Sequence, residues 1–390
     1  MSKLPAPSPE ALAHSAQLVS RIVAELRHSD GWLPFARFME LALYAPGLGY
    51  YTAGARKFGE AGDFITAPEL SPLFGRTLAR QVAEIMAASA PQILELGAGS
   101  GKLAVDLLAE LERMNALPER YAILEVSADL RQRQQQLITQ CLPHLAERVD
   151  WLDALPDELT GAVIGNEVLD ALPVHLVYWE PARPGTASGP KVRGVALNES
   201  GQFCWQDRPI DDPALLAAAS RLDVPDDYLS ELPLAASGLI ASLAQRLRQG
   251  ALLFIDYGFG AREFYHPQRH RGTLMCHYRH FAHDDPLYLP GLQDITAHVD
   301  FTAIAESGID AGLALLGYTS QAFFLINCGI TEWLREVSPE AVRDYAPLSG
   351  QLQKLTSPAE MGELFKVIAL GRGLTIPLSG FARGDLSRTL

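Results

Sequence analysis

A glycine-rich segment carries the clearest chemistry in this sequence. Residues 93–101 read ILELGAGSG, in which the candidate ligand-binding positions are Gly97, Gly99, Ser100 and Gly101. Glycines let the chain turn sharply between a strand and a helix, and they let backbone N–H groups approach a ligand closely. Such turns occur in dinucleotide oxidoreductases and in methyltransferases. The alternative is a tight strand-to-helix turn that binds nothing.

Three acidic residues accompany this turn. Glu95 lies within the strand before it, where a carboxylate can hold the turn or face a cationic ligand. Glu125 ends the next expected strand, where a nucleotide-binding fold places a carboxylate on the ribose hydroxyls. Asp153 ends the third strand, a position that can meet the amino edge of an adenine. The alternatives are a solvated strand end for Glu125 and a helix N-cap for Asp153.

The spacing of the glycines favours one cofactor. The turn reads GAGSG, whereas GxGxxG is the pattern that brings a pyrophosphate to a helix N-terminus. S-adenosyl-L-methionine carries a sulfonium, a ribose and an adenine but no phosphate, so acids around the turn suit it. The sequence therefore favours S-adenosyl-L-methionine over NAD. The other residues expected beside it in this region are Val126, Leu152 and Asn166.

Alternating strands and helices must position these residues. From residue 91 the chain alternates between expected strands at QILELG, RYAILEV, RVDWLD and GAVIGNEV and expected helices at GSGKLAVDLLAELERM and SADLRQRQQQLI. This alternation predicts a parallel sheet covered on both faces. Further expected strands are ALLFIDYG, SQAFFLI and FKVIAL.

The same pattern divides the chain into four stretches. Residues 1–90 form an N-terminal segment, with a helix expected from Pro9 to His28 and then loops and short helices. The other stretches are the first half of the core at 91–177, an insertion at 178–235, and the second half of the core at 236–390 with insertions at 258–299 and 331–364. Residues 258–299 are expected to be irregular and 331–364 helical.

Composition excludes several classes of protein. The 390 residues hold 32 Lys and Arg against 46 Asp and Glu, a net charge of −14, which argues against non-specific binding to nucleic acid. The four cysteines form no CxxC pair, so no disulfide framework or structural zinc cluster is expected. We also find no apolar run of about 18 residues, as a membrane-spanning helix needs, and no signal pattern. We therefore expect a cytosolic protein.

Seven blocks together resemble the MidA-type S-adenosylmethionine-dependent methyltransferases, which include the mitochondrial respiratory complex I assembly factor that methylates an arginine. The blocks are FMELALYAPGLGYY (38–51), GDFITAPELSPLFG (62–75), ILELGAGSGKLA (93–104), YAILEV (121–126), GNEVLDALPV (165–174), FIDYG (254–258) and GLQDITAHVDFT (291–302). The resemblance covers roughly residues 30–375.

This resemblance implies a fold, a cofactor and an acceptor. The fold is the α/β class I methyltransferase fold, a Rossmann-like, seven-stranded and mostly parallel sheet with helices on both faces. SQAFFLI and FKVIAL form its final antiparallel pair. The N-terminal segment and the insertions form a substrate cleft. The cofactor is S-adenosyl-L-methionine, and the acceptor is an arginine of a partner protein.

The block GNEVLDALPV supplies a candidate acceptor site. Glu167 and Asp170 follow the fourth strand, and ligands of open α/β sheets bind beyond the carboxyl ends of the strands. Their spacing of three suits one face of a helical turn. A guanidinium is always protonated at neutral pH, so two carboxylates can fix it and one can accept its proton. The alternative is that both acids cap a following helix.

Two more blocks carry candidates. The resemblance implies that GDFITAPE covers the cofactor, and the alternative is a capped loop that starts a helix. Its candidate residues are Asp63, Thr66, Pro68 and Glu69. In GLQDITAHVDF the candidates are Asp294, His298 and Asp300. His298 can relay a proton, because an unperturbed imidazole titrates near pH 6.5.

Histidines gather in one part of the chain. Six of the ten lie between His266 and His298, with Cys276 among them. The candidates for zinc, His277, His280 and His283, lack an acid partner of the HExxH kind. We therefore expect no metal site and interpret this stretch as a solvated insertion.

Three functional hypotheses follow. The first is methylation of an arginine in a partner protein, for which the resemblance offers a respiratory complex I subunit. The second is a non-catalytic assembly or scaffold protein that keeps the fold. The third is a methyltransferase of small molecules or nucleic acid, since fold does not fix function. The intact GAGSG, Glu125 and NEVLD favour the first. The oligomeric state stays open, with a homodimer as one interpretation.

Overall fold

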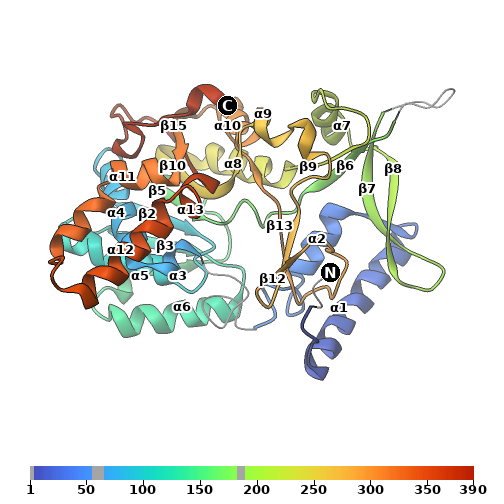
Figure 1. Ribbon diagram of the computed structural model, residues 1–390, viewed down its shortest axis with the longest axis horizontal. Helices are drawn as coiled ribbons and strands as arrows, with labels where there is room; N and C mark the ends of the chain where they lie inside the picture. The colour runs from blue at the N-terminus through green and yellow to red at the C-terminus, as the bar shows by residue number, and fades with distance from the viewer. Residues whose placement is uncertain (1–3, 55–65, 182–188) are drawn as a thin grey trace. The chain divides into compact units, whose positions relative to one another are not determined.

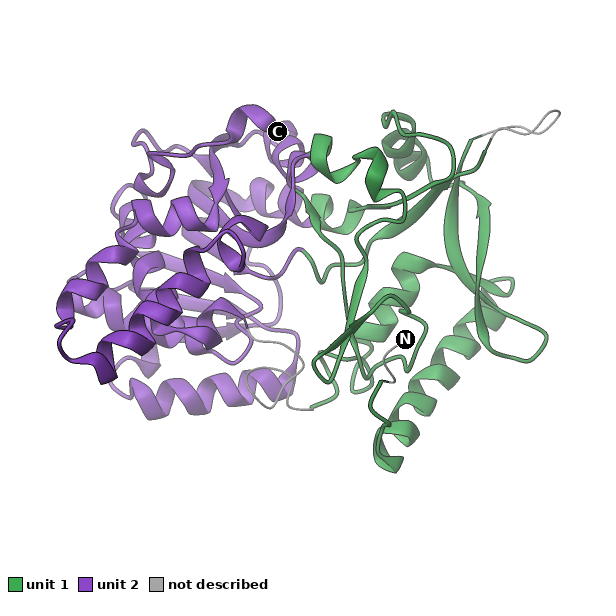
Figure 2. Ribbon diagram, in the orientation of Figure 1, with its two compact units in different colours: residues 1–64, 170–238, 261–300 green, residues 65–169, 239–260, 301–390 purple. Residues whose placement is uncertain are grey.

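The computed structural model describes residues 4–54, 66–181 and 189–390 (Figure 1). The chain divides into two compact units (Figure 2). Unit 1 comprises residues 1–64, 170–238 and 261–300, and unit 2 comprises residues 65–169, 239–260 and 301–390. Each unit is therefore assembled from segments that are distant in the sequence. Within the described ranges, we find no helix with the length and apolar character needed to cross a membrane.

Unit 2 is built on a mixed sheet. Within the described residues, seven strands of unit 2 follow the order β15-β16-β10-β5-β2-β3-β4, and the sheet counts β14 (Val299–Asp300) as an eighth strand off this order. The strands from β10 to β4 are parallel, and β16 is antiparallel to β10 and β15. The seven strands are β2 (Gln92–Leu96), β3 (Arg120–Leu124), β4 (Val149–Leu152), β5 (Leu159–Asn166), β10 (Leu247–Phe259), β15 (Ala314–Ser320) and β16 (Phe365–Arg372). The structure corrects the expected count of seven strands to eight.

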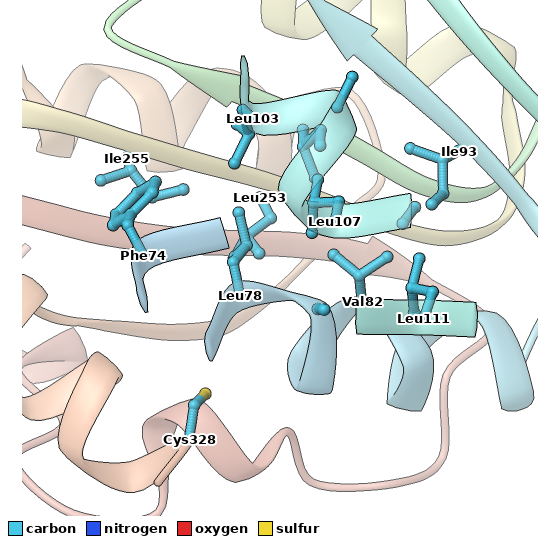
Figure 3. Close-up of a cluster of buried hydrophobic side chains, with 14 of the residues drawn as sticks. Phe74, Leu78, Val82, Ile93, Leu103, Leu107, Leu111, Leu253, Ile255 and Cys328 are labelled. Atoms are coloured by element: carbon cyan, nitrogen blue, oxygen red, sulfur yellow. The ribbon is translucent and has the colours of Figure 1, made fainter. Parts of the chain in front are cut away.

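Helices α4 (Pro72–Ala87) and α5 (Lys102–Arg113) pack together against one face of this sheet. Their facing side chains recur every four residues, which gives each helix one apolar stripe. Figure 3 shows them meeting beside Ile93 of β2 and Leu253 of β10. These side chains are Phe74, Leu78 and Val82 from α4 and Leu103, Leu107 and Leu111 from α5. Each contributes roughly 1.5–3 kcal/mol through burial.

The opposite face of the sheet is covered as well. Val367 and Ala369 of β16 belong to the core beside α4, and Ile368 and Leu370 between and after them are also fully buried. Gly308 of α10 (Phe301–Asp310) lies so close to Leu370 that a Cβ atom on Gly308 would come within 2.8 Å of Cδ1 of Leu370. The predicted covering of both faces is therefore found.

The helices that follow lie before, between or after the strands of this sheet. They are α3 (Ala67–Leu70), α4 (Pro72–Ala87), α5 (Lys102–Arg113), α6 (Ala128–Cys141), α8 (Leu234–Arg246), α10 (Phe301–Asp310), α11 (Gln321–Asn327), α12 (Val342–Thr356) and α13 (Met361–Leu364). Short 3₁₀ helices lie at Ala146–Arg148, Ile330–Glu336, Ser379–Phe381 and Ser387–Thr389.

One predicted strand is a helix. SQAFFLI is expected as a strand, but the strand β15 ends at Ser320 and residues Gln321–Asn327 form α11. The Ser320 hydroxyl caps this helix by accepting from the Phe323 amide at 3.5 Å. A short apolar run does not by itself distinguish a strand from a buried helix, and the cap decides the outcome here.

In the residues of unit 1 that the structure describes, there are two antiparallel sheets. One has the order β1-β7-β6-β9 with β8 beside β7, and the other the order β12-β11-β13. Its strands are β1 (Trp32–Pro34), β6 (His175–Trp179), β7 (Pro190–Leu197), β8 (Phe203–Pro209), β9 (Tyr228–Leu232), β11 (Met275–Tyr278), β12 (Phe281–His283) and β13 (Asp294–Thr296). Its helices are α1 (Pro9–His28), α2 (Phe35–Tyr44), α7 (Pro213–Ser220), α9 (Ala261–Phe264) and the 3₁₀ helix Pro267–Arg269. The stretch expected to be irregular, 258–299, thus contains regular strands.

Candidate cofactor and acceptor site

The glycine turn after β2 requires glycine at three positions. Gly97, Gly99 and Gly101 have φ angles of 60°, 54° and 87°, in the left-handed region that side chains disfavour. Gly101 is the N-cap residue of α5, and a Cβ atom there would lie 3.1 Å from Cγ of Gln134. The Gly97 amide donates to the Leu124 carbonyl at 3.0 Å. The turn is therefore fixed to the end of β3, and a side chain at Gly101 would press against Gln134.

Glu125 is held beside this turn by a network in unit 2. The residue is buried, and its Oε1 accepts from the Ser127 amide at 2.9 Å. Nε2 of Gln134 donates to Glu125 Oε2 at 3.0 Å and to the Gly99 carbonyl at 2.9 Å. Burial raises the pKa of Glu125. Gln134 thus orients the carboxylate relative to the glycine turn.

A pocket of about 390 Å³ lies next to Glu125. Its lining residues are Glu125, Val126, Ala128, Arg131, Gln132, Gln135 and Asp153. Val126 is 69% exposed, which offers a flat apolar surface. The Asp153 side chain is 91% exposed and accepts from Arg131 Nη2 at 2.8 Å, and the same nitrogen donates to the Leu152 carbonyl at 2.8 Å. A carboxylate, an apolar surface and a second acid at strand ends suit a ribose and an adenine.

Glu95 lies in β2, just before the glycine turn, and its side chain is buried in unit 2. It is 2% exposed and accepts a hydrogen bond from the Tyr121 hydroxyl at 2.7 Å. Burial raises the pKa of Glu95 to about 7. The carboxyl group is therefore buried in the protein, and burial favours its neutral form.

Helix α3 is tied to the glycine turn. Glu69 Oε1 accepts a hydrogen bond from the Ser100 hydroxyl. Thr66 stands at the N-cap position of α3, but its hydroxyl makes no capping bond, and Pro68 in the first turn is buried. Asp63 lies outside the described residues. The helix start expected from the sequence is present, and Glu69 brings it into contact with the turn.

The turn after β5 has an unusual backbone. Glu167 has a φ of 53°, which a non-glycine residue seldom adopts and which is enriched at functional sites. Its amide donates to the Ile255 carbonyl at 2.9 Å, and its Oε1 accepts from Asn166 Nδ2 at 3.2 Å. Among the described residues, the buried Asn166 Oδ1 has no hydrogen-bond partner, so this oxygen is available to a ligand's donor.

This geometry overturns two expectations for GNEVLD. Residues 167–174 contain no helix, and the chain continues directly into β6 (His175–Trp179). Glu167 and Asp170 therefore neither share a face of a helical turn nor cap a following helix. Because no helix follows, their carboxylates have no helix dipole to stabilise.

The turn after β5 touches the glycine turn. A Cβ atom at Gly97 would lie 3.3 Å from Cγ2 of Val168. Strands β2 and β5 are neighbours in the parallel sheet, so their carboxyl ends meet at one edge. Within unit 2 the candidate acceptor turn and the candidate cofactor turn are thus in direct contact.

The other candidates lie together in unit 1. The Ala297 amide donates to the Asp170 carbonyl at 3.0 Å, and the His298 amide donates to Thr273 Oγ1 at 3.0 Å. Asp294 accepts from the Tyr51 hydroxyl at 2.9 Å and Asp300 from the Tyr265 hydroxyl at 3.0 Å. Burial raises the pKa of both tyrosines. In the part of the chain that the structure describes, no three His, Cys, Asp or Glu side chains are grouped to hold a metal ion.

Two residues of this site escape sequence reasoning. Gln134 and Arg131 both lie on α6, and both are polar residues in a polar helix. Their spacing of three places them on one face of that helix. Nothing else in the sequence marks them, because their partners come from β3, the glycine turn and the end of β4.

Fold and candidate site together are typical of α/β proteins that bind a nucleotide-like cofactor at the carboxyl edge of a parallel sheet. A family model of S-adenosyl-L-methionine-dependent methyltransferases matches residues 77–319. The chain belongs to this family. It is an S-adenosyl-L-methionine-dependent methyltransferase, as the sequence predicts.

Relatives and solved structures agree with this assignment. The protein arginine methyltransferase NDUFAF7, mitochondrial, of Danio rerio is 30% identical over 90% of this chain and 85% of its own length. The protein of the same name in Mus musculus is also 30% identical, with the same coverage. A crystal structure of a protein from Burkholderia thailandensis bound to S-adenosyl-homocysteine is 50% identical over 100% of both chains, with a TM-score of 0.95. The predicted cofactor is thereby confirmed.

The relatives correct the predicted location. The proteins from Danio rerio, Mus musculus and Drosophila melanogaster are all named as mitochondrial. The expectation of a cytosolic protein, which rests on the cysteine pattern and on the lack of a long apolar run and of a signal pattern, is therefore wrong.

Proposed function

We propose that this methyltransferase acts on an arginine side chain of a partner protein. The observation that carries the proposal is the carboxylate of Glu167, which follows β5 in a left-handed conformation, in the turn that contacts the glycine turn through Val168. The names of the relatives, protein arginine methyltransferase, support the same acceptor. A carboxylate at this edge suits a cationic acceptor.

The residues present suit the cofactor. The pocket beside Glu125 accepts a ribose and an adenine, and the Asn166 carbonyl oxygen can accept from an amino group. We assign cofactor binding to Thr66, Pro68, Glu95, Gly97, Gly99, Ser100, Gly101, Glu125, Val126, Leu152, Asp153 and Asn166. The bound cofactor supplies an electrophilic methyl group on a sulfonium.

The protein's own side chains would then prepare the acceptor. Glu167 binds the planar guanidinium through charge-assisted hydrogen bonds, and it draws positive charge away from the attacking nitrogen. The nitrogen loses one proton as it gains the methyl group, and a carboxylate is a suitable base. Asp170 and His298 are the further candidates for holding the acceptor or moving this proton. Most of the rate gain comes from orientation and electrostatics.

The acceptor-binding segments, the acceptor protein and the form of the sheet are proposed from the resemblance to MidA-type enzymes. We infer that the segments of unit 1, which include the N-terminal residues and both insertions, bind the acceptor protein. A respiratory complex I subunit is the acceptor that this resemblance offers, with a role in assembly of that complex. The core is that of a mostly parallel, Rossmann-like sheet in which β16 is the reversed strand.

One labelling experiment tests the acceptor class. The purified protein is incubated with tritium-labelled S-adenosyl-L-methionine and an extract of cells that lack this protein. The extract is then separated into protein, RNA and small-molecule fractions. We expect label in the protein fraction. Label in RNA or in small molecules would refute the proposal.

The variant Glu167→Gln tests the assigned residue. It should keep its affinity for S-adenosyl-L-methionine within about threefold and lose transfer by at least about 100-fold, since orientation and proton acceptance both depend on the carboxylate. Asp150→Asn, an exposed acid of β4 paired with Arg120, is the control that should keep full activity. Full activity of Glu167→Gln would refute its role.

A further inference from the structure

The block FIDYG contains an acid that the proposed chemistry does not use. Asp256 of β10 is 1% exposed, so its carboxylate lies in the interior of unit 2. A buried carboxylate is costly unless hydrogen bonds or an opposite charge compensate it. Its partners therefore indicate its purpose.

Asp256 binds the turn that follows β5. Its Oδ2 lies 3.1 Å from the amide nitrogen of Val168 and 2.9 Å from that of Leu169. Its Oδ1 accepts from the amide of Tyr257 at 2.9 Å. One carboxylate oxygen thus holds the two consecutive amides directly after Glu167.

Glu167 is fixed by the same strand. Its amide donates to the carbonyl of Ile255, the neighbour of Asp256. A left-handed conformation is unfavourable for a non-glycine residue and persists only where the surroundings impose it. The amides of residues 167–169 all bind to residues 255–256, and this constraint imposes the φ of 53° at Glu167.

A buried lysine is paired with Asp256 on the neighbouring strand. Lys366 of β16 is its register partner and is 8% exposed. The Cβ atoms of such partners lie about 5 Å apart. The Lys366 ammonium donates to the carbonyl of Glu363, so a cation lies on the strand next to the buried carboxylate.

We propose that Asp256 is a positioning residue that sets the orientation of Glu167 for methyl transfer. The inference rests on the proposed function, because it takes Glu167 as the group that orients the acceptor. An asparagine occupies the same space, but one of its two ends is an N–H donor. Asp256→Asn therefore cannot accept from Val168 and Leu169 on one side and from Tyr257 on the other.

Hydrogen exchange tests the structural part without any acceptor. In Asp256→Asn the amides of Val168 and Leu169 should exchange at least about tenfold faster, as expected for the loss of hydrogen bonds to a charged group. Calorimetric affinity for S-adenosyl-L-methionine should stay within about threefold, since the pocket at Glu125 is intact. Unchanged exchange at these two amides would overturn the proposal.

A double-mutant cycle tests the catalytic part. With tritiated S-adenosyl-L-methionine and the protein fraction of the same extract, Asp256→Asn should lower the turnover rate by about 10- to 100-fold through misplacement of Glu167. The double variant with Glu167→Gln should be no slower than Glu167→Gln alone, because the two residues act as one unit. If the fold-losses in turnover rate of the two single variants multiply in the double variant, Asp256 acts independently of Glu167 and the proposal is overturned.

The controls separate this inference from the proposed function. Asp385→Asn removes another carboxylate of unit 2 that accepts from two amides, those of Tyr318 and Ser387, and should change neither exchange at Val168 nor turnover. Full activity of Asp256→Asn beside an inactive Glu167→Gln would overturn this inference alone. A fully active Glu167→Gln would overturn the proposed function and this inference with it.

Discussion

At the scale of residues, carboxylates at the strand ends have different environments. Glu125 is buried and held by Gln134, Asp153 is exposed beside Arg131, and Glu167 has a left-handed backbone. The sequence could place all three acids, because apolar runs mark the strands and each acid follows such a run. It could not supply the residues that orient them, since Gln134 and Arg131 meet their partners only in the folded chain.

Loss of the Glu125 carboxylate should weaken cofactor binding. Glu125→Ala removes an oriented, charged acceptor, and such bonds are worth about 1.5–3 kcal/mol. The dissociation constant for S-adenosyl-L-methionine should therefore rise by about 10- to 100-fold. Titration calorimetry measures it, with Asp150→Ala, the exposed acid of β4, as the control. An unchanged constant would refute the assigned ribose contact.

Glu95 should make stability depend on pH. Burial raises its pKa from the ordinary 4.5 to about 7. Between these values the folded protein binds this proton and the unfolded chain releases it, so stability falls as the pH rises from 4.5 to 7. The contribution is about 3 kcal/mol.

The variant Glu95→Gln isolates this effect. Its free energy of unfolding should decline less than that of the wild type between pH 5 and pH 8, since a carboxamide does not titrate. Urea denaturation at both pH values measures the difference. Identical pH dependence in the two proteins would show that Glu95 titrates normally.

At the scale of elements, most of the methyltransferase core follows from the sequence. The strands β2, β3, β4, β5, β10 and β16 and the helices α5 and α6 lie where periodicity predicts them. The exceptions have local causes. QAFFLIN forms α11 because Ser320 caps it, and no helix follows Glu167 because the chain enters β6 at His175. Ser320 is a capping residue type that the sequence displays, whereas the direct entry into β6 is not marked by any pattern of residues.

The glycine turn should be intolerant of a methyl group. Gly101→Ala forces alanine to a φ of 87° and places its Cβ 3.1 Å from Gln134. We expect a loss of stability of about 1–2 kcal/mol and, because Gln134 also holds Glu125 and Gly99, weaker cofactor binding. Gly201→Ala is the control. Gly201 has a φ of 73°, and no atom would lie within 4 Å of a Cβ added there.

Thermal unfolding and calorimetry distinguish these two variants. Both should lower Tm, because both strain the backbone. Only Gly101→Ala should lower the affinity for S-adenosyl-L-methionine. Equal affinities in the two variants would contradict the coupling between the turn, Gln134 and Glu125.

At the scale of the molecule, the two units are assembled from distant segments. Trp32 of β1 pairs with Ala196 of β7, and Arg193 of β7 pairs with Leu176 of β6. The sequence indicates where the core is interrupted. The inserted segments join the N-terminal residues in unit 1 because strands far apart in the sequence pair with each other. The periodicity of apolar residues does not encode such pairing.

The core between α4 and α5 should dominate the stability of unit 2. Leu78 is fully buried there (Figure 3). Leu78→Ala should reduce the free energy of unfolding by about 2–5 kcal/mol through lost burial and a cavity. Leu78→Met, of similar volume, should cost less than about 1.5 kcal/mol. Urea denaturation measures both, and equal losses would contradict close packing at this position.

The most direct measurement is the identity of the methylated amino acid. The protein and Glu167→Gln, each shown to bind the cofactor equally, are incubated with S-adenosyl-L-methionine carrying a deuterated methyl group and the protein fraction of an extract of cells lacking this protein. Mass spectrometry of the digested proteins should find deuterated methylarginine with the wild type and none with Glu167→Gln. Label on another residue type, or equal label from both proteins, would contradict arginine methylation directed by Glu167.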